Sequence, residues 1–389
     1  MSAPTIQGDC DGRFTAVRDA FRENFHQRDE VGAGVAVTVD GRPVVDLWAG
    51  FADQSRTQPW QRDTIVNVYS TTKAMTALCA HRLVEQDRLD LDAPVAHYWP
   101  EFAQQDKGTL PVRWLLSHRA GLPAMKALLP NEALYDWAAM TTALAAEAPW
   151  WDPGTAHGYH AVTFGWLVGE VVRRITGQSL GTYFRDTIAG PLGADFQIGL
   201  PVADHARCAE MSMLPPPSPD SIDLGLAIAI MSDPEGMSAR AFMNPLSLAR
   251  GPNLPEWRSA EIPAANGHAT ARAIARLYAP LANGGDIDSV HLLSPDSITR
   301  CRTEESHGSD LVLQLSTRFG AGFMLTQDFD GGRFGPNPQA FGHPGAGGSV
   351  GFADPDAHVS FGYVMNRMGP HILLDPRATA LIDAVYKSL

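Results

Sequence analysis

The stretch Ser70-Thr71-Thr72-Lys73 combines a serine with one of only four lysines in a chain that has 30 basic residues. A desolvated lysine can release its proton, whereas an arginine stays charged in proteins. A serine and a lysine three residues apart at the start of a helix lie on one face, so the amine can reach the hydroxyl. The pattern predicts a serine nucleophile with a lysine base. The competing interpretation is a helix cap followed by an unrelated lysine.

The residues that follow this pair predict a buried helix over 70–86. Apolar side chains occur on most of its sides, which is typical of a helix enclosed by the rest of the protein. Ser70 and Lys73 are therefore expected at the mouth of a dry interior. The apolar positions are Ala74, Met75, Ala77, Leu78, Ala80, Leu83 and Val84.

Both ends of the chain carry strand patterns, and the middle is mostly helical. Asp40-Gly41 joins two β-rich runs, which is a strong hairpin signal. We expect an α+β fold with an antiparallel sheet, built from both chain ends and flanked by helices, plus an inserted helical domain. The expected boundaries are 1–75 and 265–389 for the sheet domain and 76–264 for the helical one. Other expected elements are strands at 31–39, 42–48, 319–326, 347–353 and 358–366, and helices at 13–27, at 163–176 before Gly177, after 268 and from Pro376.

Residues 208–262 are irregular and rich in proline and methionine. A long connection of this kind is either a lid over a pocket or an excursion on the surface. The sequence leaves both interpretations open.

Composition excludes several classes of function. A hydrophobic content of 44% and a charged content of 19% are typical of a globular enzyme. The net charge of −13, without a basic patch, argues against nucleic-acid binding. No window approaches the ~18 apolar residues of a membrane span, and no signal-peptide pattern is visible, so we expect a cytoplasmic protein. The four cysteines are scattered, which predicts reduced thiols and neither a metal nor another cofactor.

Three further segments can be compared with the Ser70 motif. Residues 116–122 read LSHRAGL, residues 154–160 read GTAHGYH and residues 342–348 read GHPGAGG. In this order the motifs resemble the serine β-lactamase-like superfamily. Within it, the chain is most similar to the family VIII carboxylesterases, relatives of class C β-lactamases and D-Ala-D-Ala peptidases. The resemblance covers nearly the whole chain and implies a β-lactamase-like fold.

The resemblance implies a role for each matching residue. Ser70 would become acylated, Lys73 would be its base, and Tyr159 would share the proton transfer. The backbone N–H groups of Ser70 and Ala346 would form the oxyanion hole. The third motif of the family falls on His343-Pro344-Gly345, which makes His343 and Gly345 candidate substrate-binding residues. Trp151 is a further candidate substrate contact, since a tryptophan near a pocket offers apolar area.

The chain departs from the β-lactamase pattern at two motifs. Tyr159-His160-Ala161 lacks the asparagine of class C enzymes, and His343 replaces the usual cationic lysine. A histidine in an ordinary environment is mostly neutral at pH 7. A substrate carboxylate would therefore lack its fixed positive partner, which favours neutral esters over carboxylated lactams.

Other candidate residues have competing interpretations. Residues 347–351 match the G-x-S-x-G elbow of α/β-hydrolases around Ser349. Only about 40 residues follow Ser349, too few for that architecture, so we interpret the glycines as a structural entry to a strand.

His157 and His160 have a loose metal-ligand spacing, but no carboxylate or cysteine motif accompanies them. His343 could be a pocket residue or a base.

Three functional hypotheses follow. The first is a carboxylesterase that cleaves small to medium neutral esters through an acyl-enzyme on Ser70 and has a small-molecule ester as its binding partner. The second uses the same site as a β-lactamase, a D-amino peptidase or amidase, or an acyltransferase. The third is a binding module that kept the fold and lost catalysis.

Overall fold

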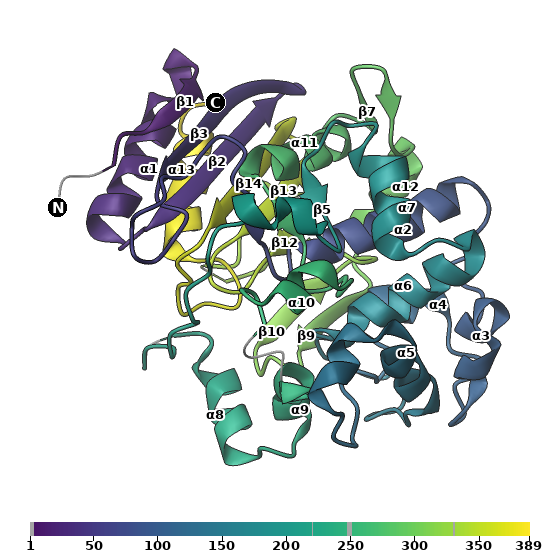
Figure 1. Ribbon diagram of the computed structural model, residues 1–389. Helices are drawn as coiled ribbons and strands as arrows, with labels where there is room; N and C mark the ends of the chain where they lie inside the picture. Colours follow the sequence, from purple (N-terminus) through teal and green to yellow (C-terminus); the bar gives the residue numbers. More distant parts are fainter. Residues whose placement is uncertain (1–3, 220, 247–250, 330) are drawn as a thin grey trace.

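The computed structural model describes residues 4–219, 221–246, 251–329 and 331–389 (Figure 1). Nine strands form one antiparallel sheet: β1 (Gln7–Cys10), β2 (Gly32–Val39), β3 (Arg42–Gly50), β9 (Ser306–Ser309), β10 (Ser316–Phe319), β11 (Met324–Leu325), β12 (Phe341–Pro344), β13 (Val350–Asp354) and β14 (Val359–Met365). Their order is β1-β3-β2-β14-β13-β12-β11-β10-β9. N-terminal and C-terminal strands therefore meet where β2 pairs with β14, which confirms the expected sheet built from both chain ends.

The hairpin of β2 and β3 has the turn that the sequence predicts. Asp40 and Gly41 both have positive φ angles, 49° and 73°, as a two-residue turn of type I′ requires. The register shifts between Val37 and Thr38, so that Thr38 pairs with Pro43. Such a bulge accommodates a proline near the start of a strand.

The helices are α1 (Thr15–Gln27), α2 (Thr72–Glu85), α3 (Val95–Tyr98), α4 (Val112–Leu116), α5 (Trp137–Ala146), α6 (Thr163–Thr176), α7 (Leu180–Phe184), α8 (Leu224–Ser232), α9 (Met237–Met243), α10 (Pro255–Ser259), α11 (Ala271–Ala282), α12 (Pro295–Arg302) and α13 (Pro376–Tyr386). None of the helices in the described part of the chain is both long and apolar enough to cross a membrane.

Small residues on the sheet let α11 approach one of its faces closely. A Cβ atom on Gly362 would lie 2.3 Å from the Ala271 carbonyl oxygen, and one on Gly351 would lie 2.3 Å from Ile274 Cγ2. Glycine in a strand often marks such a close approach. Figure 1 shows α1 and α13 side by side on the opposite face of the sheet.

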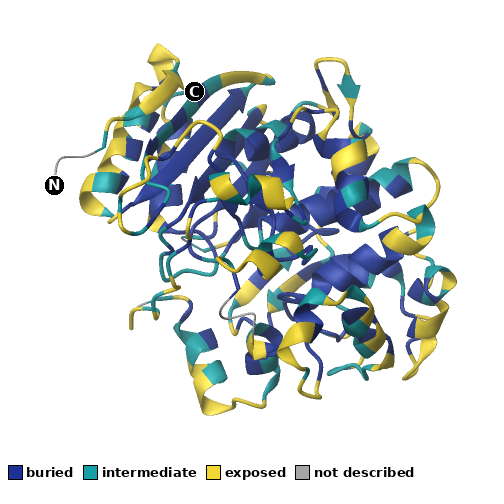
Figure 2. Ribbon diagram, viewed as in Figure 1, coloured by how far each residue is buried: buried dark blue, intermediate teal, exposed yellow. Residues whose placement is uncertain are grey.

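Helix α2 packs against α6, α7 and α12. Figure 2 shows that α2 and α6 are buried along most of their length. Gly177 follows α6 with a φ angle of 72°, the left-handed conformation expected after a helix. An inserted helical region is thus confirmed, whereas the boundaries at 75/76 and 264/265 remain a prediction.

The helix that the sequence predicts from residue 70 begins two residues later than expected. Helix α2 starts at Thr72, and Ser70 lies in the turn before it.

Two predicted strands are shorter than expected because glycines interrupt them. The predicted strand at 319–326 is broken between Phe319 and Met324, where a Cβ atom on Gly320 would lie 2.2 Å from the Cys301 carbonyl oxygen. The predicted strand at 347–353 begins only at Val350. Gly347 and Gly348, just before it, have φ angles of 85° and 134°, which a strand does not accommodate.

The segment 208–262 contains α8, α9 and α10; α8 and α9 lie at the lower edge of the molecule in Figure 1, and α10 lies near its centre. Residues 220 and 247–250 of this segment lie outside the described residues. Most of the residues that line the cavity beside Ser70 come from this segment. Its described part therefore supplies much of the wall of that cavity, and its role as a lid remains a prediction.

Candidate active site

Ser70 lies in a tight turn between β4 (Val66–Asn67) and α2. Tyr69 has a φ angle of 43°, which is uncommon for a residue other than glycine. The turn is closed by the N–H of Thr72 donating to the Tyr69 carbonyl at 2.9 Å and that of Lys73 to the Ser70 carbonyl at 3.0 Å. The left-handed residue reverses the chain just before Ser70, and Ser70 lines the cavity at the start of the helix.

Lys73 is fully buried and lies against Ser70. Its Nζ is 3.0 Å from Ser70 Oγ and donates to the carbonyl oxygens of Ala161 at 2.6 Å and Ala264 at 3.0 Å. Burial lowers the pKa of Lys73 well below its usual value. A neutral amine has two N–H groups and one lone pair. The two carbonyls take up both N–H groups, so that the lone pair is left for the Ser70 hydroxyl.

A second buried lysine in the chain has a different environment. Lys107 Nζ donates to three carbonyl oxygens, those of Gln104 at 2.9 Å, Ala145 at 3.0 Å and Glu147 at 2.6 Å. Three acceptors match the three N–H groups of an ammonium ion. Burial lowers the pKa of Lys107 to about 8. Lys107 is therefore a structural cation, and Lys73 has the surroundings of a base.

Tyr159 lies on the other side of the Ser70 hydroxyl. Its ring centroid is 4.7 Å from Lys73 Nζ. The ring stacks on Phe319 with centroids 6.0 Å apart. Burial raises the pKa of Tyr159 well above its usual value, although the nearby Ser70 hydroxyl opposes the shift. Tyr159 thus stays protonated at neutral pH and can donate its hydroxyl proton, while the amine of Lys73 can accept a proton.

His157 and His160 flank Tyr159 in the chain, and burial lowers the pKa of both, so that they are neutral. His160 donates from Nδ1 to the Gly158 carbonyl at 2.7 Å and accepts the Leu122 N–H at Nε2 at 3.0 Å. Burial lowers its pKa to about 3. His157 Nε2 instead bonds Thr317 Oγ1 at 2.9 Å. The two histidines are therefore used in separate internal hydrogen bonds.

His343 lies at the end of β12, with its ring centroid 6.0 Å from that of Tyr159. Its Nδ1 donates to the Pro344 carbonyl at 2.7 Å. Burial lowers the pKa of His343 to about 3. Within the described part of the chain, its buried Nε2 has no partner. His343 is thus a neutral side chain with a free acceptor, and it supplies no positive charge to the site.

The loop from Gly345 to Ser349 lies against the turn that carries Ser70. A Cβ atom on Gly345 would lie 2.2 Å from the Val68 carbonyl oxygen, so only glycine fits there. Ser349 Oγ donates to the same oxygen at 2.8 Å and fixes the loop beside Ser70. Ser70 and Ala346 both line the cavity, and the described residues offer neither N–H an acceptor. The two groups are free to bind an oxyanion.

The cavity beside Ser70 has a volume of about 570 Å³. Trp151 is not among its lining residues; its indole N–H donates to the Ala156 carbonyl at 3.1 Å, and its ring packs against His160. Most of the lining side chains are apolar: Ala161, Val162, Met211, Met213, Leu214, Pro215, Pro217, Leu226, Ala227, Ile230, Phe242, Met243, Pro252, Trp257, Ala265, Ala346, Met368, Pro370 and Ile372.

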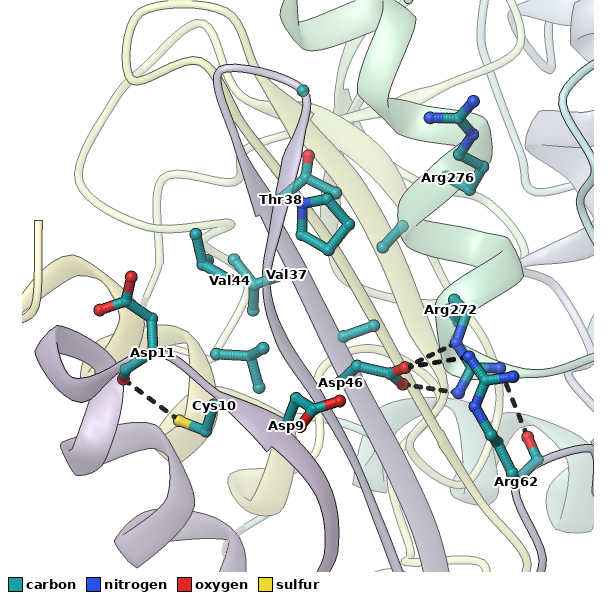
Figure 3. A pocket seen from close by; sticks show the side chains of 15 residues that line it. Asp9, Cys10, Asp11, Val37, Thr38, Val44, Asp46, Arg62, Arg272 and Arg276 are labelled. Atoms are coloured by element: carbon teal, nitrogen blue, oxygen red, sulfur yellow. Dashed lines mark hydrogen bonds and ion pairs between the residues drawn. The ribbon is translucent and has the colours of Figure 1, made fainter. Parts of the chain in front are cut away.

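A second hollow of about 530 Å³ lies over β2, β3 and α11 (Figure 3). Its Asp46 carboxylate is held by Arg272, with Nε and Nη2 each 2.7 Å from a carboxylate oxygen. Arg62 is 3.9 Å from the same carboxylate. The charges here neutralise one another, and this hollow lacks the serine and amine pair found at Ser70.

Several residues at the site have no recognisable signal in the sequence. Ala161 and Ala264 act through their backbone carbonyls, which every residue possesses. Asp223 lines the cavity from an irregular segment. Arg377 donates to the Gly347 carbonyl at 2.9 Å, one residue beyond Ala346, although 30 residues separate the two in the chain. Only the Asp375-Pro376 helix start could have drawn attention to this neighbourhood.

The chain resembles known proteins over nearly its whole length. Residues 17–385 match the family model described as Beta-lactamase. The chain is 37% identical to the esterase/beta-lactamase LipL of Mycobacterium tuberculosis, over 95% of this chain and 85% of the relative. A penicillin-binding protein homologue from Caulobacter crescentus is 44% identical with a TM-score of 0.90, and a family VIII carboxylesterase is 41% identical with a TM-score of 0.89. Both alignments cover 99% of this chain and 100% of the other. The chain therefore belongs to the beta-lactamase family, in the branch that contains the family VIII carboxylesterases.

Proposed function

We propose that the protein is a carboxylesterase that cleaves neutral esters through an acyl-enzyme on Ser70. The observation that carries the proposal is the environment of Lys73 Nζ, 3.0 Å from Ser70 Oγ with two backbone carbonyls as its other partners. This arrangement suits a neutral amine that accepts the serine proton. The names of the relatives, esterase/beta-lactamase and family VIII carboxylesterase, support the same chemistry.

In the acylation step, the Ser70 hydroxyl gives its proton to Lys73 Nζ while Oγ attacks the ester carbonyl carbon. The negative oxygen that forms is stabilised by the N–H groups of Ser70 and Ala346. The proton then passes from Lys73, by way of the Tyr159 hydroxyl, to the departing alkoxide, which leaves as an alcohol. Water attacks the acyl-enzyme in the second half of the cycle, and the same groups return the proton to Ser70.

The cavity favours a neutral substrate. None of its described lining residues is a lysine, an arginine or a histidine, and one of them, Asp223, is an acid. A carboxylated lactam would bring a second negative charge into a largely apolar cavity without a cation to balance it, and an unpaired buried charge is costly. Hydrolysis of a β-lactam is the second candidate function, since LipL carries both activities in its name.

Comparing two chromogenic substrates tests this choice. We expect kcat/KM for p-nitrophenyl butyrate to exceed that for nitrocefin by at least about 100-fold, because a missing charge partner costs several kcal/mol. Ser70→Ala provides the background for both assays, and Ser349→Ala should keep measurable esterase activity, since Ser349 binds the Val68 carbonyl. Faster turnover of nitrocefin, or an inactive Ser349→Ala beside an active Ser70→Ala, would contradict the proposal.

A further inference from the structure

One carboxylate in the apolar cavity has an oxygen without a partner. Asp223 lines the cavity and is 3% exposed. Its Oδ2 is 3.2 Å from His371 Nδ1 and accepts from Ser221 Oγ at 3.3 Å. Its Oδ1 is buried and, within the described part of the chain, has no hydrogen-bond partner. Buried carboxylate oxygens are normally paired, so an unpaired one on a residue that lines a binding cavity indicates a place for a ligand group.

The neighbours of Asp223 hold the carboxylate in place. The Asp223 N–H donates to Ser221 Oγ at 3.1 Å, and α8 begins at the next residue. On the other side, the His371 carbonyl accepts the Gly347 N–H at 2.8 Å, which ties His371 to the loop of Ala346. The carboxylate is therefore fixed from both sides, in the cavity that also contains Ser70.

We propose that Asp223 Oδ1 accepts a hydrogen bond from a hydroxyl group of the substrate, at the end of an apolar chain remote from the ester bond. The proposal rests on the proposed esterase function and names its substrate class, the esters of ω-hydroxy acids or of diols. The apolar lining accommodates the methylene chain, and Asp223 is the one acid among the described lining residues. A single polar group in an apolar pocket fixes the orientation of a ligand.

A neutral hydroxyl fits this position better than an ammonium group. The hydrogen bond that His371 donates to Asp223 raises the pKa of His371; Asp375 adds to this shift, whereas burial and Arg377 oppose it. The carboxylate is thus already shared with a basic partner. A hydroxyl satisfies the free oxygen without the desolvation penalty that a second cation would incur.

Matched pairs of esters test the proposal. The first series comprises p-nitrophenyl esters of straight-chain acids and of their ω-hydroxy and ω-amino counterparts. The second comprises butyrate esters of alkan-1-ols and monobutyrates of the matching diols. In wild type we expect the hydroxyl form to be preferred in kcat/KM by roughly ten- to a hundredfold in at least one series, the size typical of a hydrogen bond to a charged group.

Two variants separate recognition from folding. Asp223→Leu should lose the hydroxyl preference, which is measured as the ratio of kcat/KM for each hydroxyl ester to that for its plain partner. Asp233→Leu is the matched control, because Asp233 is exposed at the other end of α8 and does not line the cavity. It should behave as wild type. A wild-type enzyme without a hydroxyl preference in either series, a preference that persists in Asp223→Leu, or a stronger preference for the ω-amino esters would overturn the proposal.

A binding measurement keeps the outcome independent of the esterase function. Octan-1-ol and octane-1,8-diol can be titrated against wild type and Asp223→Leu with tryptophan fluorescence as the readout, since Trp257 lines the cavity. The affinity for the diol divided by the affinity for the mono-alcohol should be at least about tenfold higher in wild type than in Asp223→Leu. If no plain ester is hydrolysed but this affinity shift is observed, the esterase function is rejected and the hydroxyl-binding site is retained. An unchanged ratio would reject the site.

Discussion

Replacing Lys73 with alanine is expected to lower kcat for p-nitrophenyl butyrate by about 10²–10⁴-fold, the usual contribution of a positioned base. Lys73 Nζ is the basic group closest to the Ser70 hydroxyl, at 3.0 Å, and burial lowers its pKa so that the neutral form is available. Since Ser70 and Lys73 act as one unit, the double variant should be little worse than the poorer single one. Steady-state kinetics of the three variants measure this.

Two matched substitutions separate the base from a mere positive charge. Lys73→Arg keeps the charge but cannot release a proton, so it should be about as inactive as Lys73→Ala. Lys107→Met removes the other buried lysine, which should lower stability but leave kcat within a few-fold, because Lys107 bonds only backbone carbonyls. In wild type, kcat/KM should rise with pH as Lys73 loses its proton, with a midpoint well below that of an exposed lysine. An active Lys73→Arg enzyme would contradict this assignment.

Replacing Arg377 with methionine is expected to lower the free energy of unfolding by about 3–5 kcal/mol. Arg377 is 3% exposed; its Nη1 donates to Glu30 Oε1 at 3.0 Å and its Nε to Asp375 Oδ1 at 2.8 Å. Removing the guanidinium leaves the buried Glu30 without its cation. Burial already raises the pKa of Glu30, although Arg377 opposes the shift. The variant should also lose activity, because Arg377 binds the carbonyl of Gly347, the residue after Ala346, whose N–H is a proposed oxyanion donor.

Urea unfolding followed by tryptophan fluorescence measures this loss. The control is Arg367→Met, because Arg367 and Asp29 form an ion pair at 3.4 Å with side chains that are 43% and 81% exposed. Exposed pairs contribute at most about 1 kcal/mol. Equal losses for the two variants would show that the buried network contributes no more than a surface pair.

The parts of the fold that sequence reasoning predicts are those with local signals. Asp40-Gly41 requires two left-handed residues, and the chain turns there. Gly177 ends α6 because it alone can adopt the left-handed conformation without cost. The broken strand after Phe319 could not be predicted, since the break reflects the approach of Gly320 to a distant carbonyl oxygen of Cys301.

The candidate site also contains residues that a sequence motif reveals and residues that no local signal reveals. Ser70 and Lys73 stand three residues apart and can be recognised as a pair, and Tyr159 follows from the resemblance to a family. The carbonyl of Ala264 lies 191 residues from Lys73 in the chain and has no sequence signature. Arg377 and Glu30 are 347 residues apart, and neither belongs to a motif. Trp151 was expected at the substrate but packs on His160, because its indole N–H is bonded within its own loop.

The most direct test of the central claim is the identity of the residue that becomes covalently modified. The protein is treated with a fluorophosphonate ester, digested and mapped by peptide mass spectrometry, with Ser70→Ala and Lys73→Ala in parallel. The account predicts one adduct, on Ser70, which is absent in Ser70→Ala and forms much more slowly in Lys73→Ala. An adduct on Ser349, or an unmodified Ser70 in an enzyme that still hydrolyses esters, would contradict it.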